Sequence, residues 1–120
     1  MEFYNNRAIY LQIADHIIRQ ILMQERKAGS RLPSVRELAS EIEVNPNTIA
    51  KTYNWLAEQS IIKMQRGIGY FITDAAYDQA VSIRKSELLE IDLPKIIDKA
   101  NLLGLSLEHL LKEYEHETKK

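Results

Sequence analysis

Two helix starts lie close together in the stretch SVRELASEIEVNPNTIAKTYNWL, and this spacing constrains the fold more than any other feature of the sequence. Ser34 precedes an apolar helical pattern and Glu37 follows three residues later, which is the signature of a capping box. Asn-Pro-Asn-Thr begins at Asn45, directly in front of a second pattern whose apolar positions share one face. The sequence therefore predicts two short helices joined by a tight turn.

An amphipathic pattern precedes this pair of helices, and a change of period follows it. Apolar residues recur every three or four positions over about residues 9–24, which predicts a helix, and the polar residues 25–34 predict a loop. Two β-rich runs at residues 61–65 and 70–73 flank Arg66-Gly67-Ile68-Gly69, which predicts a hairpin. The expected fold is mainly α with a small β-hairpin, a winged helix-turn-helix over residues 1–73.

Size and composition limit what this chain can do. A length of 120 residues with 45% hydrophobic content suits one small domain, or one domain with an appendage, and excludes a large cofactor-binding fold. The absence of cysteine excludes disulfides and thiolate metal sites. The start MEFYNNRAIY lacks the apolar run of a signal peptide, and no later segment approaches the ~20 apolar residues of a membrane span. We therefore expect a cytoplasmic protein without a membrane partner.

Charge is distributed unevenly along the chain. The net charge is −1 overall, but residues 1–73 carry nine basic against seven acidic side chains, a net of +2, and the remainder carries −3. A phosphate backbone responds to the local arrangement of basic groups and not to the total. The overall charge therefore does not exclude a nucleic-acid partner.

The Asn-Pro-Asn-Thr stretch has a functional explanation if the following helix enters a major groove by its amino-terminal end. Asn45 or Asn47 caps the helix, and Pro46 fixes the chain before its first turn. Asparagine can pair bidentately with adenine, the methyl group of Thr48 can contact thymine, and Lys51 can reach a phosphate or a guanine. Taken alone the stretch fits an ordinary turn and cap, but the hairpin and the basic residues around it favour DNA binding.

Five successive motifs carry a resemblance to a known family. They are AIYLQI, GSRLPSVRELA, VNPNTIAKTY, LAEQSII and RGIGYFIT, in order over residues 8–73. They resemble the GntR family of bacterial transcription regulators, and the Asn-Pro-Asn-Thr form with a short carboxy-terminal segment most resembles the YtrA-like subfamily. With the residue patterns, this resemblance leads us to expect a homodimeric, sequence-specific regulator of double-stranded DNA, a repressor rather than an activator, that needs no cofactor. It leaves any small-molecule effector unknown.

The resemblance also implies roles for individual residues. Arg36 on the second helix reads guanine, the start of the third helix contacts the operator, and the wing reaches a minor groove. Arg31 and Tyr53 match positions that hold phosphates. The DNA-binding candidates are Arg31, Ser34, Arg36, Asn45, Asn47, Thr48, Lys51, Tyr53, Arg66 and Gly67.

Two positions depart from the family pattern, which has glycine where Glu43 and Ser60 stand. Glu43 is expected to accept a left-handed conformation at a cost of order 1 kcal/mol. It also introduces a negative charge near the DNA side. We expect weaker affinity and not a loss of binding.

Residues 74–120 carry a second apolar pattern and are predicted to be helical. Pro94 either kinks one long helix or starts a new one, Gly104 ends that helix, and Ser106 caps the last. The apolar faces either pack back on the domain or form a homodimer interface, and we favour the second. The dimerisation candidates are Leu89, Leu93, Ile96, Ala100, Leu103, Leu107, Leu110 and Leu111.

Two other classes of function fit the sequence less well. An enzyme or metal site lacks support, because His16, His109 and His116 are scattered without a paired nucleophile or carboxylate cluster. A winged-helix module that binds only protein would not need Arg36, Lys51 and Arg66 on one surface. The sequence favours a DNA-binding regulator.

Overall fold

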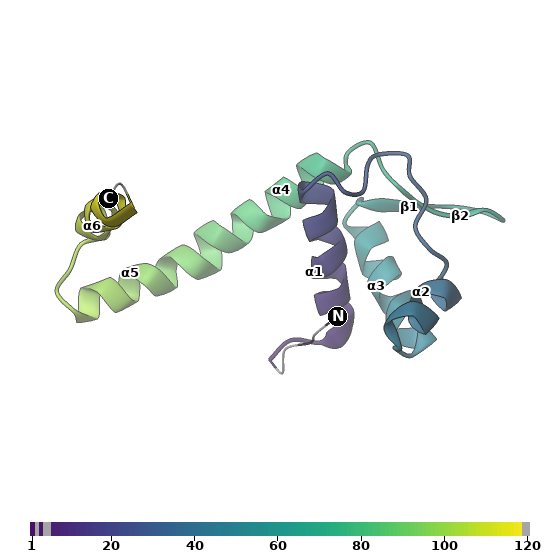
Figure 1. The fold of residues 1–120 in the computed structure, drawn as a ribbon, viewed down its shortest axis with the longest axis horizontal. Coiled ribbons are helices and arrows are strands. Elements are labelled where there is room, and N and C mark those ends of the chain that lie inside the picture. Colours follow the sequence, from purple (N-terminus) through teal and green to yellow (C-terminus); the bar gives the residue numbers. More distant parts are fainter. Residues whose placement is uncertain (2, 4–5, 119–120) are drawn as a thin grey trace. The chain divides into compact units, whose positions relative to one another are not determined.

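The computed structural model describes residues 1, 3 and 6–118, and the chain forms two compact units, Met1–Ser82 and Ile83–Lys120. The elements in chain order are α1 (Ile9–Leu22), α2 (Val35–Ile42), α3 (Pro46–Glu58), β1 (Ile62–Gln65), β2 (Gly69–Ile72), α4 (Ala76–Glu87), a π-helical turn η1 (Leu88–Asp92), α5 (Leu93–Leu102) and α6 (Leu107–Thr118) (Figure 1). The fold is mainly helical with one antiparallel hairpin, and this confirms the predicted fold class.

The division between the units falls later than the domain boundary expected after Thr73. Unit 1 continues to Ser82 and so includes the first turns of α4. Ala76 and Ala80 on these turns are buried. Small apolar side chains at this spacing let a helix pack closely, so a fragment ending near Thr73 would lack part of unit 1.

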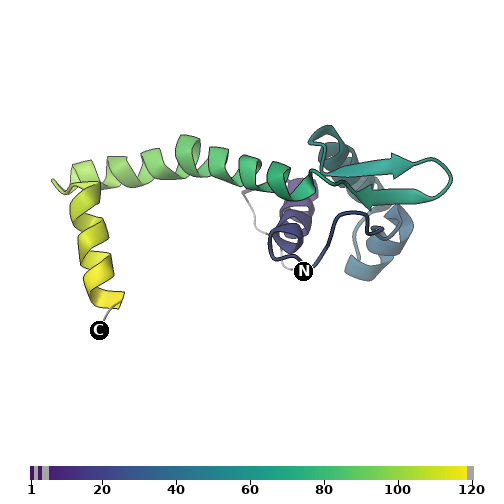
Figure 2. The ribbon, with the colours of Figure 1, turned by 90° about the horizontal axis from the view of Figure 1, so that it is seen from above.

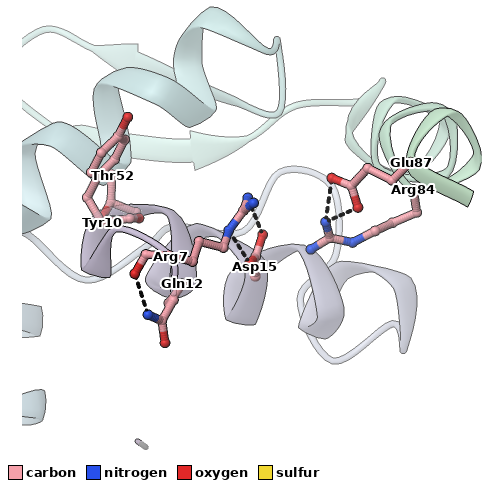
Figure 3. Close-up of polar contacts among 7 residues, drawn as sticks. All are labelled: Arg7, Tyr10, Gln12, Asp15, Thr52, Arg84 and Glu87. Atoms are coloured by element: carbon pink, nitrogen blue, oxygen red, sulfur yellow. Dashed lines mark hydrogen bonds and ion pairs between the residues drawn. The ribbon is translucent and has the colours of Figure 1, made fainter. Parts of the chain in front are cut away.

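The core of unit 1 lies between its helices and the inner face of the hairpin. Both α1 and α2 pack on α3 (Figure 2). The hydroxyl of Thr52 on α3 donates to the carbonyl oxygen of Tyr10 on α1 over 2.8 Å, which satisfies a buried polar group across the two helices (Figure 3). The buried apolar side chains include Ile13, Ala14, Ile17, Ile18, Ile21, Leu32, Leu38, Ala39, Ile49, Tyr53, Leu56, Ile61, Ile62 and Ile72.

Helix α1 begins and ends at identifiable local features. Before its first turn, the Arg7 guanidinium pairs with Asp15 at 2.9 Å, and the side-chain amide of Gln12 donates to the Arg7 carbonyl (Figure 3). The helix ends at Leu22, two residues before the predicted end at Gln24. Gln24 has a left-handed backbone with φ of 60°, a conformation that cannot continue a right-handed helix.

A third backbone segment pairs with the two-stranded hairpin, and the sequence did not reveal it. Residues 29–32 run alongside β2: the Leu32 N–H donates to the Tyr70 carbonyl, and the Ile72 N–H donates to the Ser30 carbonyl, both at 2.9 Å. This stretch was predicted only as a loop. Its pairing ties the segment that leads into α2 to the wing.

Both positions where glycine was expected have left-handed backbones. Glu43 has φ of 56° and ψ of 51° after the last turn of α2, and Ser60 has φ of 61° after α3. The Thr73 hydroxyl donates to the Ser60 carbonyl at 2.7 Å, which helps to hold this turn. The left-handed conformation expected of Glu43 is therefore confirmed, and Ser60 adopts one as well.

Pro94 lies in a helical backbone without a break. The Leu93 N–H donates to the Leu88 carbonyl, five residues earlier, so one π-helical turn precedes α5. Pro94 is the second residue of α5 and has no N–H to continue the bonding to the preceding helical turn. Of the two alternatives, a helix that continues past Pro94 through a local distortion fits the structure.

Unit 2 ends in a separate helix after the turn at Gly104. The Ser106 hydroxyl accepts from the His109 N–H at 3.1 Å, which confirms the predicted cap of α6. Along the described part of the chain, no helix combines the length and apolar character needed to cross a bilayer.

Candidate nucleic-acid interface

The amino-terminal turn of α2 carries an exposed arginine. The Ser34 hydroxyl accepts from the Glu37 N–H, and the Glu37 carboxylate accepts from the Ser34 N–H, both at 3.1 Å. These bonds lower the pKa of Glu37, with the backbone bond as the largest cause, and they confirm the capping box. Arg36 lies between them in sequence, is exposed, and forms no ion pair within the described residues.

The turn into α3 settles which asparagine caps the helix. The side-chain oxygen of Asn45 accepts from the Asn47 N–H at 2.8 Å, and Pro46 occupies the first helical position. Asn47 is exposed, and its side-chain amide makes no hydrogen bond within the described residues. Both of its amide atoms are therefore available for a bidentate contact, whereas the oxygen of Asn45 is occupied by the cap.

Further along α3 the exposed and buried faces separate as predicted. Ile49, Thr52 and Leu56 are buried, while Lys51 and Asn54 are exposed. Thr48 is partly exposed on the first turn. The first turns of α3 therefore present polar and basic side chains outward from a helix whose other face is fixed in the core.

Tyr53 has a different environment from the one its family position implied. It is fully buried, and its hydroxyl donates to the Pro33 carbonyl at 2.6 Å. Its ring meets the Tyr70 ring edge-on, with centroids 5.0 Å apart. Burial raises the pKa of Tyr53 to about 12. A direct phosphate contact would require the bond to Pro33 to be broken, so Tyr53 joins α3, the loop before α2 and the wing.

The wing carries three of the sequence candidates. Arg66 and Gly67 lie in the turn between β1 and β2, and both are exposed. Arg31 forms a bridge with Phe71 on β2, and its guanidinium packs over the backbone of Gly69. A Cβ atom placed on Gly69 would lie 3.1 Å from Nε of Arg31. Neither Gly69 nor its relation to Arg31 was identified from the sequence, because the contact joins segments far apart in the chain.

The candidates are brought together by contacts within unit 1. Helix α2 packs on α3, only three residues separate them, and the segment carrying Arg31 pairs with the wing. Figure 1 and Figure 2 show α2 beside α3 with the hairpin projecting past both. Arg36, Lys51 and Arg66 thus lie exposed on elements that pack against one another.

The candidate dimerisation residues differ in exposure. Leu89, Ile96, Leu103 and Leu111 are exposed, and Leu103 reaches 74%. Ala100 is only 3% exposed in the last turn of α5, where its carbonyl accepts from the Leu105 N–H. Ala100 therefore supports the fold of unit 2 and offers no free surface for a partner. The half-buried candidates are Leu93, Leu107 and Leu110.

The histidines do not form a cluster with metal-ligand geometry in the described part of the chain. Nε2 of His109 lies 3.3 Å from the Glu113 carboxylate, one turn further along α6, and both side chains are exposed. This pair is an ordinary surface contact of a helix.

Comparison with known proteins identifies the family. Residues 9–72 match the GntR family, described as bacterial regulatory proteins. The chain is 38% identical over 110 residues to YhcF of Bacillus subtilis, named an uncharacterized helix-turn-helix transcriptional regulator, covering 92% of this chain and 89% of that protein. It is also 38% identical over 102 residues to the repressor YtrA of Bacillus subtilis, covering 85% and 78%.

A solved structure shows the same fold. The GntR family transcriptional regulator from Listeria monocytogenes is 33% identical, with a TM-score of 0.79 over 95% of this chain and 98% of that one. The similarity to YtrA agrees with the predicted YtrA-like subfamily, and the relatives are named as regulators and not as enzymes. The chain therefore belongs to the GntR family of bacterial regulatory proteins and is a transcriptional regulator with a DNA-binding domain.

Proposed function

We propose that the protein is a homodimeric repressor that binds a pseudo-palindromic operator in double-stranded DNA. The observation that carries the proposal is the exposed, capped start of two adjacent helices, where Arg36, Asn47 and Lys51 lack partners within the described residues. A recognition helix enters the major groove by this end.

Each exposed group has a suitable DNA partner. Arg36 can donate two parallel hydrogen bonds to guanine, Asn47 can pair with adenine, and the Thr48 methyl can contact thymine. Lys51 lies one turn further along α3, within reach of a phosphate. At the start of α2, the Ser34 hydroxyl keeps its proton to donate to a phosphate, because its oxygen accepts the capping bond.

Asn45 and the wing complete the proposed surface. The side-chain nitrogen of Asn45 can donate to the phosphate backbone of DNA while its oxygen caps α3. Arg31 and Arg66 can bind phosphates or a minor-groove edge, and the turn at Gly67 has no side chain to hinder approach. Tyr53 holds these parts in place from the interior.

The exposed apolar residues of unit 2 support the homodimer. Leu89, Ile96 and Leu103 are each about half exposed or more, which is unusual for so many large apolar residues in a short segment. A second copy would remove them from water, and burying each such side chain contributes roughly 1.5–3 kcal/mol. A two-fold dimer then requires two half-sites related by the same symmetry.

Repression would follow from occupation of the operator by the dimer. A dimer bound across a promoter excludes the transcription machinery without any chemistry, so no cofactor is required. The similar protein YtrA of Bacillus subtilis is named a repressor, which favours this sign of regulation over activation.

The test begins with selection of bound duplexes from a random pool by the intact protein. We expect a selected sequence with two-fold symmetry and an affinity that falls steeply with salt, because phosphate contacts release counterions. Transcription from a promoter carrying the selected duplex should fall when the protein is added. Binding that is independent of salt, or a pool that shows no enrichment, would contradict the proposal.

Arg36 provides the residue-level test of base reading. Arg36→Ala should remove a contact worth about 1–3 kcal/mol and relax the preference at one base pair in each half-site. Lys51→Ala serves as the comparison, because loss of a phosphate contact should weaken all duplexes alike. Titrations against the selected duplex and single-base variants distinguish the two, and unchanged discrimination by Arg36→Ala would show that α2 does not read bases.

A further inference from the structure

A cavity of about 250 Å³ lies in unit 1 where the end of α1, the loop after it, the end of β2 and the start of α4 meet. Its lining comes from residues 21–28 and residues 72–77. Among the described residues, none of the DNA-binding candidates lines it. Sites for drug-sized ligands occupy roughly 300–1,000 Å³, so this cavity suits a smaller molecule.

Backbone hydrogen bonds hold the walls of this cavity in place. The Gly29 N–H donates to the Ile72 carbonyl at 2.8 Å, which ties the loop after α1 to β2. The Lys27 carbonyl accepts from the Ser30 N–H at 3.1 Å and from the Ser30 hydroxyl at 2.6 Å. The cavity is therefore formed before a ligand arrives, as is usual for sites that bind small molecules.

The floor of the cavity is apolar. Ile21, Ile72 and Ala76 line it, and none of these three is more than 3% exposed. The Tyr77 side chain also lines the cavity and is 46% exposed, so part of its ring is open to a ligand. An apolar group of limited size would gain free energy by leaving water for this floor.

Charged groups of both signs complete the lining. Arg26 is half-buried, and its Nε donates to the Gln20 side chain at 2.6 Å. Its terminal amino groups make no hydrogen bond or ion pair within the described residues. Lys27 and Asp74 are exposed and form no ion pair there either. The cavity thus offers two cations and one carboxylate without partners around an apolar floor.

We propose that this cavity binds a free α-amino acid with an apolar side chain. Arg26 and Lys27 would pair with the carboxylate of the ligand, and Asp74 would pair with its ammonium group. The side chain of the ligand would lie on the apolar floor. A simple carboxylic acid would leave Asp74 without a partner, and a simple amine would leave both cations without one. Only a molecule with both charges uses all three groups.

The ligand would also regulate operator binding, and this step rests on the proposed function. Ala76 and Tyr77 belong to the first turn of α4, which continues past Ser82 into unit 2. A ligand that favours one position of this turn would change the separation at which a dimer presents its two DNA-reading units. Because the proposed repressor binds DNA without a cofactor, the ligand should weaken operator binding.

Binding is tested on the intact protein without DNA, by nuclear magnetic resonance titration. The probes share one carbon skeleton: L-leucine, 4-methylpentanoate, which lacks the ammonium group, and 3-methylbutylamine, which lacks the carboxylate. We expect L-leucine to shift the Ala28 and Ala76 amide signals saturably and the other two probes to bind about tenfold more weakly or less, because each loses one charge-assisted contact.

Substitutions at exposed positions assign the contacts. Lys27→Gln should weaken L-leucine and 4-methylpentanoate but not 3-methylbutylamine, whereas Asp74→Asn should weaken L-leucine and 3-methylbutylamine but not 4-methylpentanoate. Arg19→Gln is the matched control, because it removes an exposed cation of α1 that does not line the cavity. Ala28→Trp should fill the cavity and abolish binding. Ala28 is exposed, so this variant should keep the unfolding midpoint of wild type.

The absence of saturable shifts with L-leucine, or shifts that Ala28→Trp leaves intact, would overturn the binding site. Regulation is measured separately, as the affinity for the selected duplex with and without saturating L-leucine. We expect the affinity to fall by at least about threefold in wild type and to stay constant in Ala28→Trp. Equal affinities in wild type would refute the regulation. A wild type that selects no duplex would refute the operator proposal, while the titrations without DNA would still decide whether the cavity binds the amino acid.

Discussion

At the scale of single residues, Glu43 combines backbone strain with an unfavourable charge. Its left-handed backbone ends α2, and its N–H donates to the Ala39 carbonyl. Glu43 precedes Asn45, the N-cap of α3, by two residues, so its carboxylate belongs to the turn before the recognition helix. Strain affects the stability of the free protein, whereas the negative charge affects approach to DNA. Two substitutions separate these effects.

Glu43→Gly should stabilise the protein by up to about 1 kcal/mol, because glycine adopts this conformation without strain, less the greater entropy it loses on folding. Glu43→Gln retains the strain and should leave stability nearly unchanged. Both variants should bind DNA more tightly than wild type at low salt, because both remove the charge. Urea unfolding and DNA titration measure the two quantities. Equal stability of Glu43→Gly and Glu43→Gln would show that the left-handed backbone costs nothing here.

Tyr53→Phe should lower stability by about 1 kcal/mol at neutral pH, because the Pro33 carbonyl loses its donor while the ring packing remains. The contribution of Tyr53 ionisation to the pH dependence of stability should also disappear. Burial raises the pKa of Tyr53 to about 12 from an ordinary value of 10.0, so the unfolded chain loses this proton first. The stabilisation is complete below pH 10 and is lost as pH rises toward 12.

The difference in unfolding free energy between wild type and Tyr53→Phe isolates this titration from that of other groups. It should be constant from pH 7 to about 9.5 and shrink above pH 10. A difference that stays constant through the alkaline range would mean that the hydroxyl is as accessible when folded as when unfolded.

The sequence predicts residues that depend on local chemistry better than those that depend on distant ones. The Ser34 capping box follows from residues three apart in the sequence and was predicted. The left-handed conformation of Glu43 was expected only because the family has glycine at that position. The burial of Tyr53 depends on Pro33 and Tyr70, which come from other parts of the chain. Periodicity also left Asn45 and Asn47 as equal candidates for the cap, and only the backbone geometry distinguishes them.

At the scale of elements, the wing and the segment before α2 act together through Gly69. Gly69→Ala should place a methyl group against the Arg31 guanidinium and weaken DNA binding through Arg31. In a double-mutant cycle, Gly69→Ala should therefore add little to the loss caused by Arg31→Ala. Anisotropy titrations on the selected duplex provide the four affinities.

Gly67→Ala is the control for backbone strain. Its φ of 80° is also unfavourable for alanine, but the added Cβ meets nothing within 4 Å. It should lower stability without the coupling to Arg31. If losses from Gly69→Ala and Arg31→Ala are fully additive, Gly69 does not position the arginine.

Helices and the hairpin were predictable because their periods differ and extend over many residues. The pairing of residues 29–32 with β2 was not, because the stretch is too short to show a period of two and its partner lies about forty residues away. The π-helical turn before Pro94 was not predicted. The sequence left open whether Pro94 kinks one helix or starts another, since proline excludes an ordinary bond but does not specify the distortion that replaces it.

At the scale of the whole molecule, unit 2 should determine oligomeric state. We expect two variants to be monomeric. One is a chain ending at Ser82, which retains all of unit 1, and the other combines Ile96→Glu with Leu103→Glu. Introducing charge at two apolar positions on each protomer removes several kcal/mol of burial. Both should retain weak, salt-sensitive DNA binding and lose most operator affinity. Sedimentation equilibrium and titration against one and two half-sites measure this.

Asn101→Glu is the control for added charge, because it places one carboxylate at an exposed polar position of α5. It should remain dimeric. A chain ending at Ser82 that sediments as a dimer would assign the interface to unit 1 instead. Hydrophobic periodicity predicts helices in the carboxy-terminal segment, but it does not show that Ala76 and Ala80 belong to the core of unit 1.

The open turn of the wing also affects how such a regulator evolves. Arg66 and Ile68 are exposed in a turn that is closed by the hydrogen bond from the Ile68 N–H to the Gln65 carbonyl, so folding places little constraint on either side chain. Selection can therefore exchange them without an accompanying loss of stability, unlike Tyr53, whose replacement disturbs three segments together. Changes at positions 66 and 68 should therefore cost the fold less than changes at position 53.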